Sequence, residues 1–278
     1  KGDSKNSREE IIACKLSRIK HKLVVMSGKG GVGKSSVATY LSLALAREGF
    51  KVGLLDVDLH GPSIPKMFGL KGVLNITPER RIVPHQYSPN LKIVSIESML
   101  EDADSAIIWR GPLKHGVIAQ FLADCDWDEL DFLVIDSPPG TGDEPLSVSR
   151  LITDAKAIIV TTPQEVALAD VRKSINFCRK VDMEILGLVE NMSGLFCPHC
   201  NEFIPIFRTG GGQKTSESMK VPFLGELPFD PKVVEGGDSG VPVLEGGEET
   251  PFTTAVLRFV KTTLARLGNG SDSQGSNE

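Results

Sequence analysis

The feature that most constrains this chain is a glycine-rich octapeptide, GKGGVGKS, at residues 28–35. It matches the pattern G-x-x-x-x-G-K-[ST] in full, follows the apolar run KLVVMS at 22–27, and precedes a helix-forming stretch at about 35–48. Glycines let successive backbone N–H groups turn inward around a phosphate, and the N-terminus of the following helix adds its dipole. The sequence therefore predicts a nucleotide phosphate site in an α/β fold, in preference to a glycine-rich turn without a ligand.

Two side chains of this loop carry its chemistry. We expect the Lys34 amine to reach the β- and γ-phosphates and to be catalytic, and the Ser35 hydroxyl to ligate Mg²⁺. The backbone of the loop is expected to surround the phosphates. The predicted nucleotide-binding residues of this segment are Gly28, Lys29, Gly30, Gly31, Val32, Gly33, Lys34, Ser35 and Ser36.

A second lysine, Lys29, follows the first glycine of the loop. A plain phosphate loop does not need it, and one interpretation is a solvated loop charge. We favour the variant loop G-K-G-G-x-G-K-[ST], in which this lysine crosses a dimer interface to the nucleotide of the partner. A cation supplied in trans stabilises charge in the transition state, as an arginine finger does. Lys29 is therefore predicted to be catalytic.

Three carboxylates are expected beside the phosphates. Asp56 and Asp58 end one apolar strand, and Asp136 ends another, LVID. The carboxyl ends of parallel strands are where ligands bind in such sheets. We expect Asp58 to orient the attacking water, Asp56 to lie nearer Mg²⁺, and Asp136 to hold Mg²⁺ or its water. The loop 137–143 (SPPGTGD) suits a sensor of the γ-phosphate, whereas aspartates that merely end a strand are the alternative.

A missing motif and one side chain indicate which nucleotide base the site accepts. The sequence contains no N-K-x-D motif, which would supply the carboxylate that usually selects guanine. Asn191, just past the expected strand at 184–189, is placed to hydrogen-bond adenine instead. ATP is therefore the expected nucleotide.

Apolar runs and helical patterns alternate along the chain, which predicts a mostly parallel sheet covered by helices on both faces. The predicted fold class is an α/β P-loop NTPase. Strands are expected at 22–27, 51–58, 91–97, 131–136, 156–161, 184–189 and about 222–227, and helices at about 35–48, 111–124, 165–180 and 252–267.

The expected organisation has three parts: an N-terminal arm at 1–19, an ATPase domain with a C-x-x-C site at 20–267, and a disordered polar tail at 268–278. Within the domain, residues 61–90 are rich in proline and glycine and lack clear periodicity. We interpret them as a long functional loop or a small insertion.

The composition excludes several classes of protein. At 40% hydrophobic and 24% charged residues, the 278-residue chain has enough aliphatic side chain to form a core. No apolar run approaches the ~18 residues of a membrane span, and a net charge of −5 argues against a nucleic-acid partner. Five cysteines suit a reducing compartment, and no secretory signal is visible. We expect a cytoplasmic protein that binds neither membrane nor nucleic acid.

Only two cysteines have the spacing of ligands, Cys197 and Cys200 in C-P-H-C. Cys178 falls at the helical spacing of core residues, Cys125 ends a helical pattern, and Cys14 lies in polar surroundings. The pair at 197 and 200 is therefore the candidate metal site.

Four interpretations of this pair remain. A redox dithiol needs the start of a helix, but Pro205 and β-branched residues follow. A zinc site within one chain needs two more ligands, and His199 is too close in sequence to be a comfortable third. Inert thiols are the third interpretation. The fourth is a site shared across a two-fold axis, where two copies supply four thiolates to Zn²⁺ or a [4Fe–4S] cluster. The dimerising loop favours this fourth interpretation and leaves the metal open.

Several segments together resemble the Mrp/ApbC iron–sulfur carrier ATPases, a group that includes the eukaryotic cytosolic scaffold ATPases of iron–sulfur assembly. The similarity runs from about Lys20 to Leu267. The motifs that carry it are GKGGVGKSS, DVDLHGPSIPKMFGL (56–70), WRGP (109–112), WDELDFLVIDSPPGTGDEPLSV (127–148) and NMSGLFCPHC (191–200).

The resemblance implies a MinD-like fold and a slow ATP hydrolase. It implies a homodimer, or a heterodimer with a paralogue, that bridges a [4Fe–4S] cluster on its C-x-x-C pairs and passes it to apoproteins. Lys29 and Asp58 fall on matching motif positions, so it also supports their catalytic roles. Two family features are absent from the sequence: an N-terminal extension with four cysteines, which trimming before Lys1 would remove, and a small acidic N-terminal domain.

Two other functions share part of this pattern. A MinD/ParA-like positioning ATPase shares the variant loop, but it needs a membrane helix or a basic DNA face. The amphipathic stretch 252–267 has three basic residues and is better interpreted as a packed terminal helix. A NifH-like reductase also bridges a cluster, but its cysteines lie far apart in sequence. A zinc-bridged P-loop ATPase is the chemical alternative.

Overall fold

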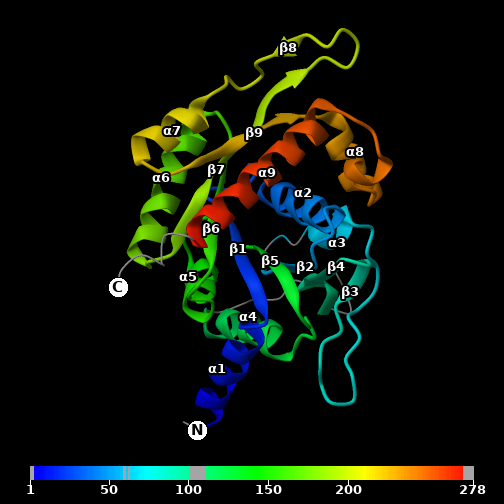
Figure 1. Ribbon diagram of the computed structural model, residues 1–278, viewed down its shortest axis with the longest axis vertical. Helices are drawn as coiled ribbons and strands as arrows, with labels where there is room; N and C mark the ends of the chain where they lie inside the picture. Colours follow the sequence, from blue (N-terminus) through cyan, green and yellow to red (C-terminus); the bar gives the residue numbers. More distant parts are fainter. Residues whose placement is uncertain (1–2, 59–60, 62, 100–110, 272–278) are drawn as a thin grey trace.

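The computed structural model describes residues 3–58, 61, 63–99 and 111–271 (Figure 1). Its centre is a nine-stranded sheet with the order β3-β4-β2-β5-β1-β6-β7-β8, in which β9 also pairs with β7. The strands are β1 Ile19–Ser27, β2 Val52–Asp56, β3 His85–Ser88, β4 Leu91–Ser95, β5 Leu130–Asp136, β6 Lys156–Thr161, β7 Glu184–Phe196, β8 Phe203–Ile204 and β9 Phe223–Phe229.

The pairing is parallel across most of the sheet. Strands β4, β2, β5, β1, β6, β7 and β9 run parallel to one another, and among the strands of the described residues only β3 and β8 pair antiparallel, with β4 and β7 respectively. Because parallel strands end at one edge, the segments that follow β1, β2, β5 and β7 converge there. The predicted mostly parallel sheet is confirmed.

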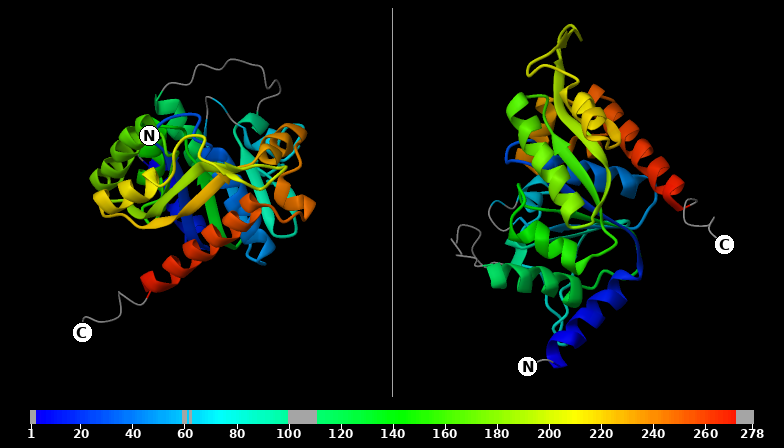
Figure 2. Two further views of the ribbon diagram at one scale, coloured as in Figure 1. Left: turned by 90° about the horizontal axis from the view of Figure 1, so that it is seen from above. Right: turned by 90° about the vertical axis from the view of Figure 1, so that its left-hand side faces the viewer.

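Helices cover both faces of the sheet (Figures 1 and 2). One face carries α1 Asp3–Leu16, α4 Gly111–Asp124, α5 Asp143–Leu151, α6 Glu165–Lys180 and α7 Gly211–Met219. The other carries α2 Lys34–Arg47, α3 Ile64–Met67, α8 Pro231–Ser239 and α9 Pro251–Ser271, and the short 3₁₀ turns are η1 Glu97–Met99 and η2 Val243–Gly246.

Two hydrophobic cores lie on either side of the sheet, and alternate residues of the central strands enter each. In β1, Val24 and Met26 face the core under α4 and α6, whereas Leu23 and Val25 face the core under α2 and α9. Successive side chains of a strand point to opposite faces. A strand that is buried on both faces must therefore be continuously apolar, which is the pattern that predicted β1.

The structure adds elements that the sequence patterns do not show. The interval 61–90, interpreted as a loop or insertion, contains α3 and the edge strand β3. The interval 1–19, interpreted as an arm, contains α1, whose Ile12 and Leu16 are buried in the core with α4. Helices α5, α7 and α8 were also not predicted. Their short lengths and low apolar content leave too little periodicity to detect.

The last helix behaves as expected over most of its length. Helix α9 buries Phe252, Val256, Phe259 and Val260 against the sheet and α2. It continues to Ser271, so the predicted polar tail begins later than residue 268, and residues 272–278 lie outside the described part of the chain. No helix in the described ranges is long and apolar enough to cross a membrane.

Candidate nucleotide and metal sites

The phosphate loop lies between β1 and α2, and its backbone requires glycine at specific positions. Gly33 precedes α2 with a φ of 78°, and a Cβ there would lie 2.1 Å from the Nδ2 atom of Asn191. A Cβ on Gly28 would lie 2.3 Å from the carbonyl carbon of Asp170 in α6. The left-handed φ and these close approaches admit only glycine. The loop is therefore packed between α6 and β7.

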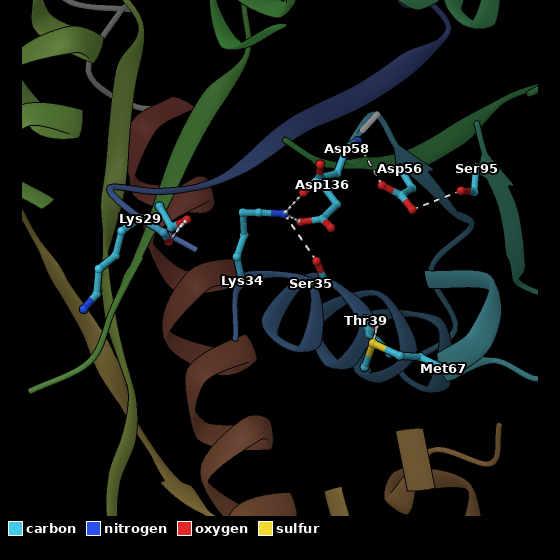
Figure 3. Close-up of polar contacts among 10 residues, drawn as sticks. Lys29, Lys34, Ser35, Thr39, Asp56, Asp58, Met67, Ser95 and Asp136 are labelled. Atoms are coloured by element: carbon cyan, nitrogen blue, oxygen red, sulfur yellow. Dashed lines mark hydrogen bonds and ion pairs between the residues drawn. The ribbon is translucent and has the colours of Figure 1, made fainter. Parts of the chain in front are cut away.

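Lys34, the first residue of α2, extends into a group of carboxylates (Figure 3). Its side chain is 6% exposed, and its amine lies 2.5 Å from Asp136 Oδ1 and 3.9 Å from Asp58 Oδ2. The amine also lies 3.3 Å from Ser35 Oγ. The structure thus brings together four of the residues that the sequence analysis assigned to catalysis and Mg²⁺ binding.

The remaining aspartate of this group, Asp56, is next to Asp136 in the sheet, because the two residues are register partners at the ends of β2 and β5. Asp56 accepts hydrogen bonds of 3.0 Å from Ser95 Oγ and from the backbone N–H of Asp58. Burial, followed by the negative charge of Asp136, raises the pKa of Asp56 from 3.8 to about 8. Burial also raises the pKa of Asp136, against the opposing effect of Lys34.

The oxygen atoms beside the Lys34 amine suit a hydrated Mg²⁺ ion as ligands. Asp136 Oδ2 is buried and has no hydrogen-bond partner within the described part of the chain. The hydroxyl of Ser35 lies on the same side of the loop, beside the Lys34 amine (Figure 3). Mg²⁺ prefers a few carboxylate and hydroxyl oxygens and keeps several waters. The unpaired oxygen of Asp136 and the Ser35 hydroxyl are therefore the atoms that fit this ion.

Lys29 does not join the cluster around Lys34. Its side chain points away from Lys34, and its backbone carbonyl accepts a 3.0 Å hydrogen bond from Ser27 Oγ (Figure 3). It is half-buried and is one of the residues that line the phosphate cavity. In this orientation the Lys29 amine is directed away from Lys34 and its carboxylates.

The segment that follows β5 closes one side of the phosphate loop. The backbone N–H of Gly140 donates a 2.8 Å hydrogen bond to the carbonyl of Ser27, and Pro139 lines the phosphate cavity. Helix α5 then begins at Asp143. The predicted γ-phosphate sensor at 137–143 therefore contacts the chain at the point where β1 enters the phosphate loop.

Two cavities meet at α2. The first, of about 330 Å³, surrounds the phosphate loop. The second, of about 310 Å³, shares Ser36, Ser63 and Met67 with the first. Apart from these, its lining comes from β7, α3, the end of β9, α8 and α9, and consists of Lys66, Asn191, Met192, Pro228, Phe229, Asp230, Val233, Val234, Gly237, Asp238 and Phe252. The arrangement offers an apolar space for a base beyond a polar space for phosphates.

Asn191 lies in the second cavity, but its place in the chain differs from the prediction. Strand β7 does not end at residue 189 and continues to Phe196, so Asn191 lies within it. Its Nδ2 atom donates a 2.9 Å hydrogen bond to the carbonyl of Val32 in the phosphate loop. The side chain is 6% exposed. Asn191 therefore connects β7 directly to the phosphate loop.

Cys197 and Cys200 lie in the tight turn between β7 and β8, in a hairpin that projects beyond the sheet at the top of Figure 1. The turn is closed by backbone hydrogen bonds from Cys197 N to Glu202 O (2.9 Å) and from Asn201 N to Cys197 O (2.8 Å). Hydrogen bonds from the backbone of Cys200 and His199 lower the pKa of the Cys197 thiol. Cys200 is exposed, so the pair is accessible at the surface.

The other cysteines follow the predictions. Cys125 and Cys178 are buried, and burial raises the pKa of both thiols, to about 12 for Cys178. Cys14 is exposed on α1. No group of three or more His, Cys, Asp or Glu side chains in the described ranges is placed to hold a metal ion.

Sequence reasoning missed several residues of these sites. Ser95 ends β4 beside Asp56, and the rule about carboxyl ends of parallel strands was sufficient to find it. Phe229, Asp230 and Phe252 line the second cavity, but they lie far from the phosphate loop in sequence and in no recognisable motif.

Known proteins resemble the chain over nearly its whole length. A family model described as a NUBPL iron-transfer P-loop NTPase of the ParA group matches residues 18–264. The cytosolic Fe–S cluster assembly factor CFD1 of Saccharomyces cerevisiae is 50% identical over 232 residues, which are 81% of this chain and 79% of that protein. An iron–sulfur cluster carrier protein of Methanocaldococcus jannaschii is 48% identical over 249 residues, covering 88% and 86%.

Solved structures share the fold. A nucleotide-binding protein from Archaeoglobus fulgidus in complex with ADP superposes with a TM-score of 0.76 at 39% identity, covering 88% of this chain and 95% of that one. The cell-division ATPase MinD of Pyrococcus furiosus gives a TM-score of 0.65 at 25% identity, covering 89% and 99%. These matches confirm the predicted MinD-like fold and the resemblance to iron–sulfur carrier ATPases. The chain belongs to the NUBPL iron-transfer family of P-loop NTPases.

Proposed function

We propose that this protein is an ATP-dependent iron–sulfur carrier of the cytosol, which holds a [4Fe–4S] cluster as cargo and transfers it to apoproteins. One observation carries the proposal: a single strand, β7, places Asn191 at the phosphate loop and ends directly before Cys197. A nucleotide site and an exposed thiol pair are thereby joined by one element. The relatives named as iron–sulfur cluster assembly factors and carriers support the same function.

The phosphate site supports slow ATP hydrolysis. Mg²⁺, when bound, would neutralise charge on the phosphates, and Ser35 and Asp136 are the residues that would hold it. Lys34 neutralises the β- and γ-phosphates, and Asp56 lies behind Asp136, where its hydrogen bond from Ser95 fixes its orientation. Asp58, at the cavity wall, orients the attacking water.

Lys29 completes the site from a second protomer. Its side chain points away from Lys34 and the carboxylates of its own protomer, which suits a cation delivered to a partner's nucleotide. A lysine supplied in this way switches hydrolysis on only after assembly. The dimer partner is a second copy of this chain or a paralogue.

ATP is the proposed nucleotide. The cavity beside the phosphate loop is lined mainly by apolar side chains such as Met67, Phe229 and Phe252, which suit the faces of a purine. Asn191 and Asp230 line the same cavity and supply polar atoms for the base edge. The ADP complex of the A. fulgidus protein shows that a protein of this fold accepts an adenine nucleotide.

The thiol pair suits a cargo site that two chains share. Two thiolates are half of the four that a tetrahedral Zn²⁺ site or a [4Fe–4S] cluster requires. The hairpin projects from the body of the molecule, so a second copy can bring its own pair to the same place (Figure 2). A carrier must also release its cargo, which an exposed site permits.

A positioning function of the MinD type is not favoured, because the apolar face of α9 is packed against the sheet and unavailable as a membrane anchor. MinD resembles this chain in fold. Its function requires a surface that α9 does not present.

The test is the metal content of anaerobically purified protein. Brown colour and about four irons per dimer support the carrier function, and Cys197→Ser should abolish both. Cys14→Ser is the matched control, because Cys14 is an exposed thiol outside the hairpin. Stoichiometric zinc with no iron after anaerobic reconstitution would contradict a cluster cargo and favour the zinc-bridged ATPase.

A further inference from the structure

A buried carboxylate, that of Glu190, lies at the base of the hairpin that carries the thiols. Glu190 is 0% exposed. Its Oε1 atom accepts a 2.7 Å hydrogen bond from Ser193 Oγ and a 3.1 Å hydrogen bond from the backbone N–H of Gly210. Its Oε2 atom accepts a further hydrogen bond from the backbone N–H of Gly212 in the first turn of α7. One carboxylate thus receives three donors.

These donors mark the two ends of the excursion that contains the cysteines. Ser193 lies in β7, four residues before Cys197, and Gly210 immediately precedes α7. Both ends donate to the same oxygen of Glu190. Residues 194–209, including Cys197 and Cys200, therefore form a loop whose ends are joined by one side chain.

The local packing is built around this carboxylate. A Cβ on Gly212 would lie 2.9 Å from the Cβ of Glu190, so only glycine lets α7 approach so closely. A buried carboxylate is costly unless it is fully hydrogen-bonded, and the three donors supply that. Removing any one donor would leave the buried carboxylate with fewer partners, which is costly.

Glu190 is also adjacent to the nucleotide site. Asn191, the next residue, donates to the carbonyl of Val32 in the phosphate loop. Gly33 lies against this same side chain, because a Cβ there would lie 2.1 Å from Asn191 Nδ2. The chain of contacts runs from Val32 through Asn191 and Glu190 to both ends of the thiol hairpin.

We propose that Glu190 is a positioning residue that holds the Cys197–Cys200 hairpin in a fixed orientation and transmits nucleotide occupancy to it. The identity of the cargo rests on the proposed function, whereas the mechanical link does not. A movement of Asn191 on ATP binding changes the direction of both hairpin ends at once, because both are bonded to the neighbouring carboxylate. In a shared site this changes the distances among four thiolates.

The diagnostic variant is Glu190→Gln, which keeps the shape of the side chain but places an amide NH₂ where an acceptor is needed. At least one of the donors at Ser193, Gly210 and Gly212 then loses its acceptor. The matched control is Glu226→Gln. Glu226 Oε2 is the more distant acceptor for the single Ser193 hydroxyl proton, at 3.2 Å, and Glu226 is exposed, so water can take its place.

Hydrogen–deuterium exchange tests the link between Glu190 and the thiol hairpin without any metal. In Glu190→Gln we expect amides of residues 193–212 to exchange at least about tenfold faster, as loss of a buried acceptor opens the segment locally. The exchange rates of the β1 and β5 amides should remain close to wild type. The melting temperature of the protein should do the same. A general loss of protection throughout the sheet would show a purely structural role and overturn the proposal.

Cobalt(II) is the probe for the thiols, because its bond to thiolate gives a distinct absorption band. Glu190→Gln should weaken Co²⁺ binding by about tenfold or more, the usual effect of losing a group that holds metal ligands in place. Glu226→Gln should bind Co²⁺ as the wild type does. Unchanged affinity in Glu190→Gln would contradict the positioning role.

Transmission is tested by alkylation of Cys197 and Cys200 with iodoacetamide, followed by mass spectrometry. ATP should change the alkylation rate in wild type and in Glu226→Gln, and should have no effect in Glu190→Gln. An equal ATP effect in all three proteins would refute the link.

If Glu190→Gln does not fold, Ser193→Ala removes only the hydrogen bond from Ser193 to Glu190 and should give a partial effect in the same assays. A wild type that binds neither iron nor Co²⁺ would overturn the carrier function, while exchange still tests Glu190.

Discussion

The Lys34 amine lies 2.5 Å from Asp136 Oδ1, so the lysine of the phosphate loop and the aspartate that ends β5 form a buried ion pair. Their side chains are 6% and 1% exposed. The pair connects the glycine-rich loop to the strand that precedes the predicted γ-phosphate sensor. In the proposed ATP complex, a phosphate would compete with Asp136 for this amine and free a carboxylate oxygen for Mg²⁺.

We predict that Lys34→Ala abolishes ATP turnover. The change removes the cation that meets the phosphates and leaves Asp136 as a buried charge with one partner fewer. Loss of a donor of this kind costs at least about 100-fold in rate. Phosphate release measures turnover, and fluorescent-nucleotide binding should also weaken. Retention of wild-type turnover would contradict the assignment.

Lys29→Ala should spare nucleotide binding and reduce hydrolysis, because the lysine acts on the partner's nucleotide. Catalytic cations of this kind contribute about 10³- to 10⁵-fold. A mixture of Lys29→Ala and Lys34→Ala proteins gives the sharper test. The Lys29→Ala subunit keeps its own Lys34 and receives Lys29 from its partner, so the mixture should recover hydrolysis that neither variant has alone. A mixture as inactive as its components would show that Lys29 acts in cis.

The pKa of Asp56 predicts how stability depends on pH. This pKa is raised from 3.8 to about 8, so the folded chain retains a proton that the unfolded chain releases. The stabilisation from this group is complete below about pH 3.8 and is lost as the pH rises through about 8. Asp56→Asn removes this titration, so it should gain stability relative to wild type as the pH rises over that window. Each 1 kcal/mol corresponds to ~2–4 °C in melting temperature for a protein of this size.

The control for this experiment is Asp131→Asn. A hydrogen bond from Lys20 lowers the pKa of Asp131, so its contribution has the opposite sign and is lost as the pH falls. Thermal melts of the three proteins between about pH 2.5 and pH 8.5 give the differences, because the Asp131 contribution is lost below about pH 4. Parallel curves for Asp56→Asn and wild type would show that Asp56 does not retain its proton.

Metal binding and dimerisation should be coupled if Cys197 and Cys200 meet a second pair across a two-fold axis. Either single change, Cys197→Ser or Cys200→Ser, should then prevent both, whereas Cys14→Ser should prevent neither. Light scattering on metal-free and reconstituted protein measures the oligomer. A fully metal-loaded monomer would exclude the shared site.

Nucleotide and cargo should influence each other through β7. If ATP changes how firmly the cluster is held, the cluster must change ATP affinity by the same factor, because the two effects are one coupling free energy. We expect ATP affinity to differ between cluster-loaded and cluster-free wild type. Cys197→Ser should resemble the cluster-free form. Equal affinities in all three samples would show two independent sites.

The local sequence by itself determined the phosphate loop, the apolar strands and the C-P-H-C pair. Their signals lie in short spacings: glycines at fixed positions before a helix, runs of residues buried on both faces, and two cysteines in one turn. Even the meeting of Asp56, Asp58 and Asp136 was predictable, because parallel strands end at one edge of the sheet.

Only the tertiary structure decided which distant residues complete the sites. Phe229 and Phe252 enter the base cavity because β9 and α9 pack beside α2, and no motif marks them. Strand β7 continues past residue 189 because it pairs with β9 and β8, pairings that the sequence of β7 does not encode alone. Glu190 is an ordinary glutamate in the sequence. Its role arises from the return of the chain at Gly210, since hydrogen bonds between residues far apart in the chain depend on how the elements pack and not on local pattern.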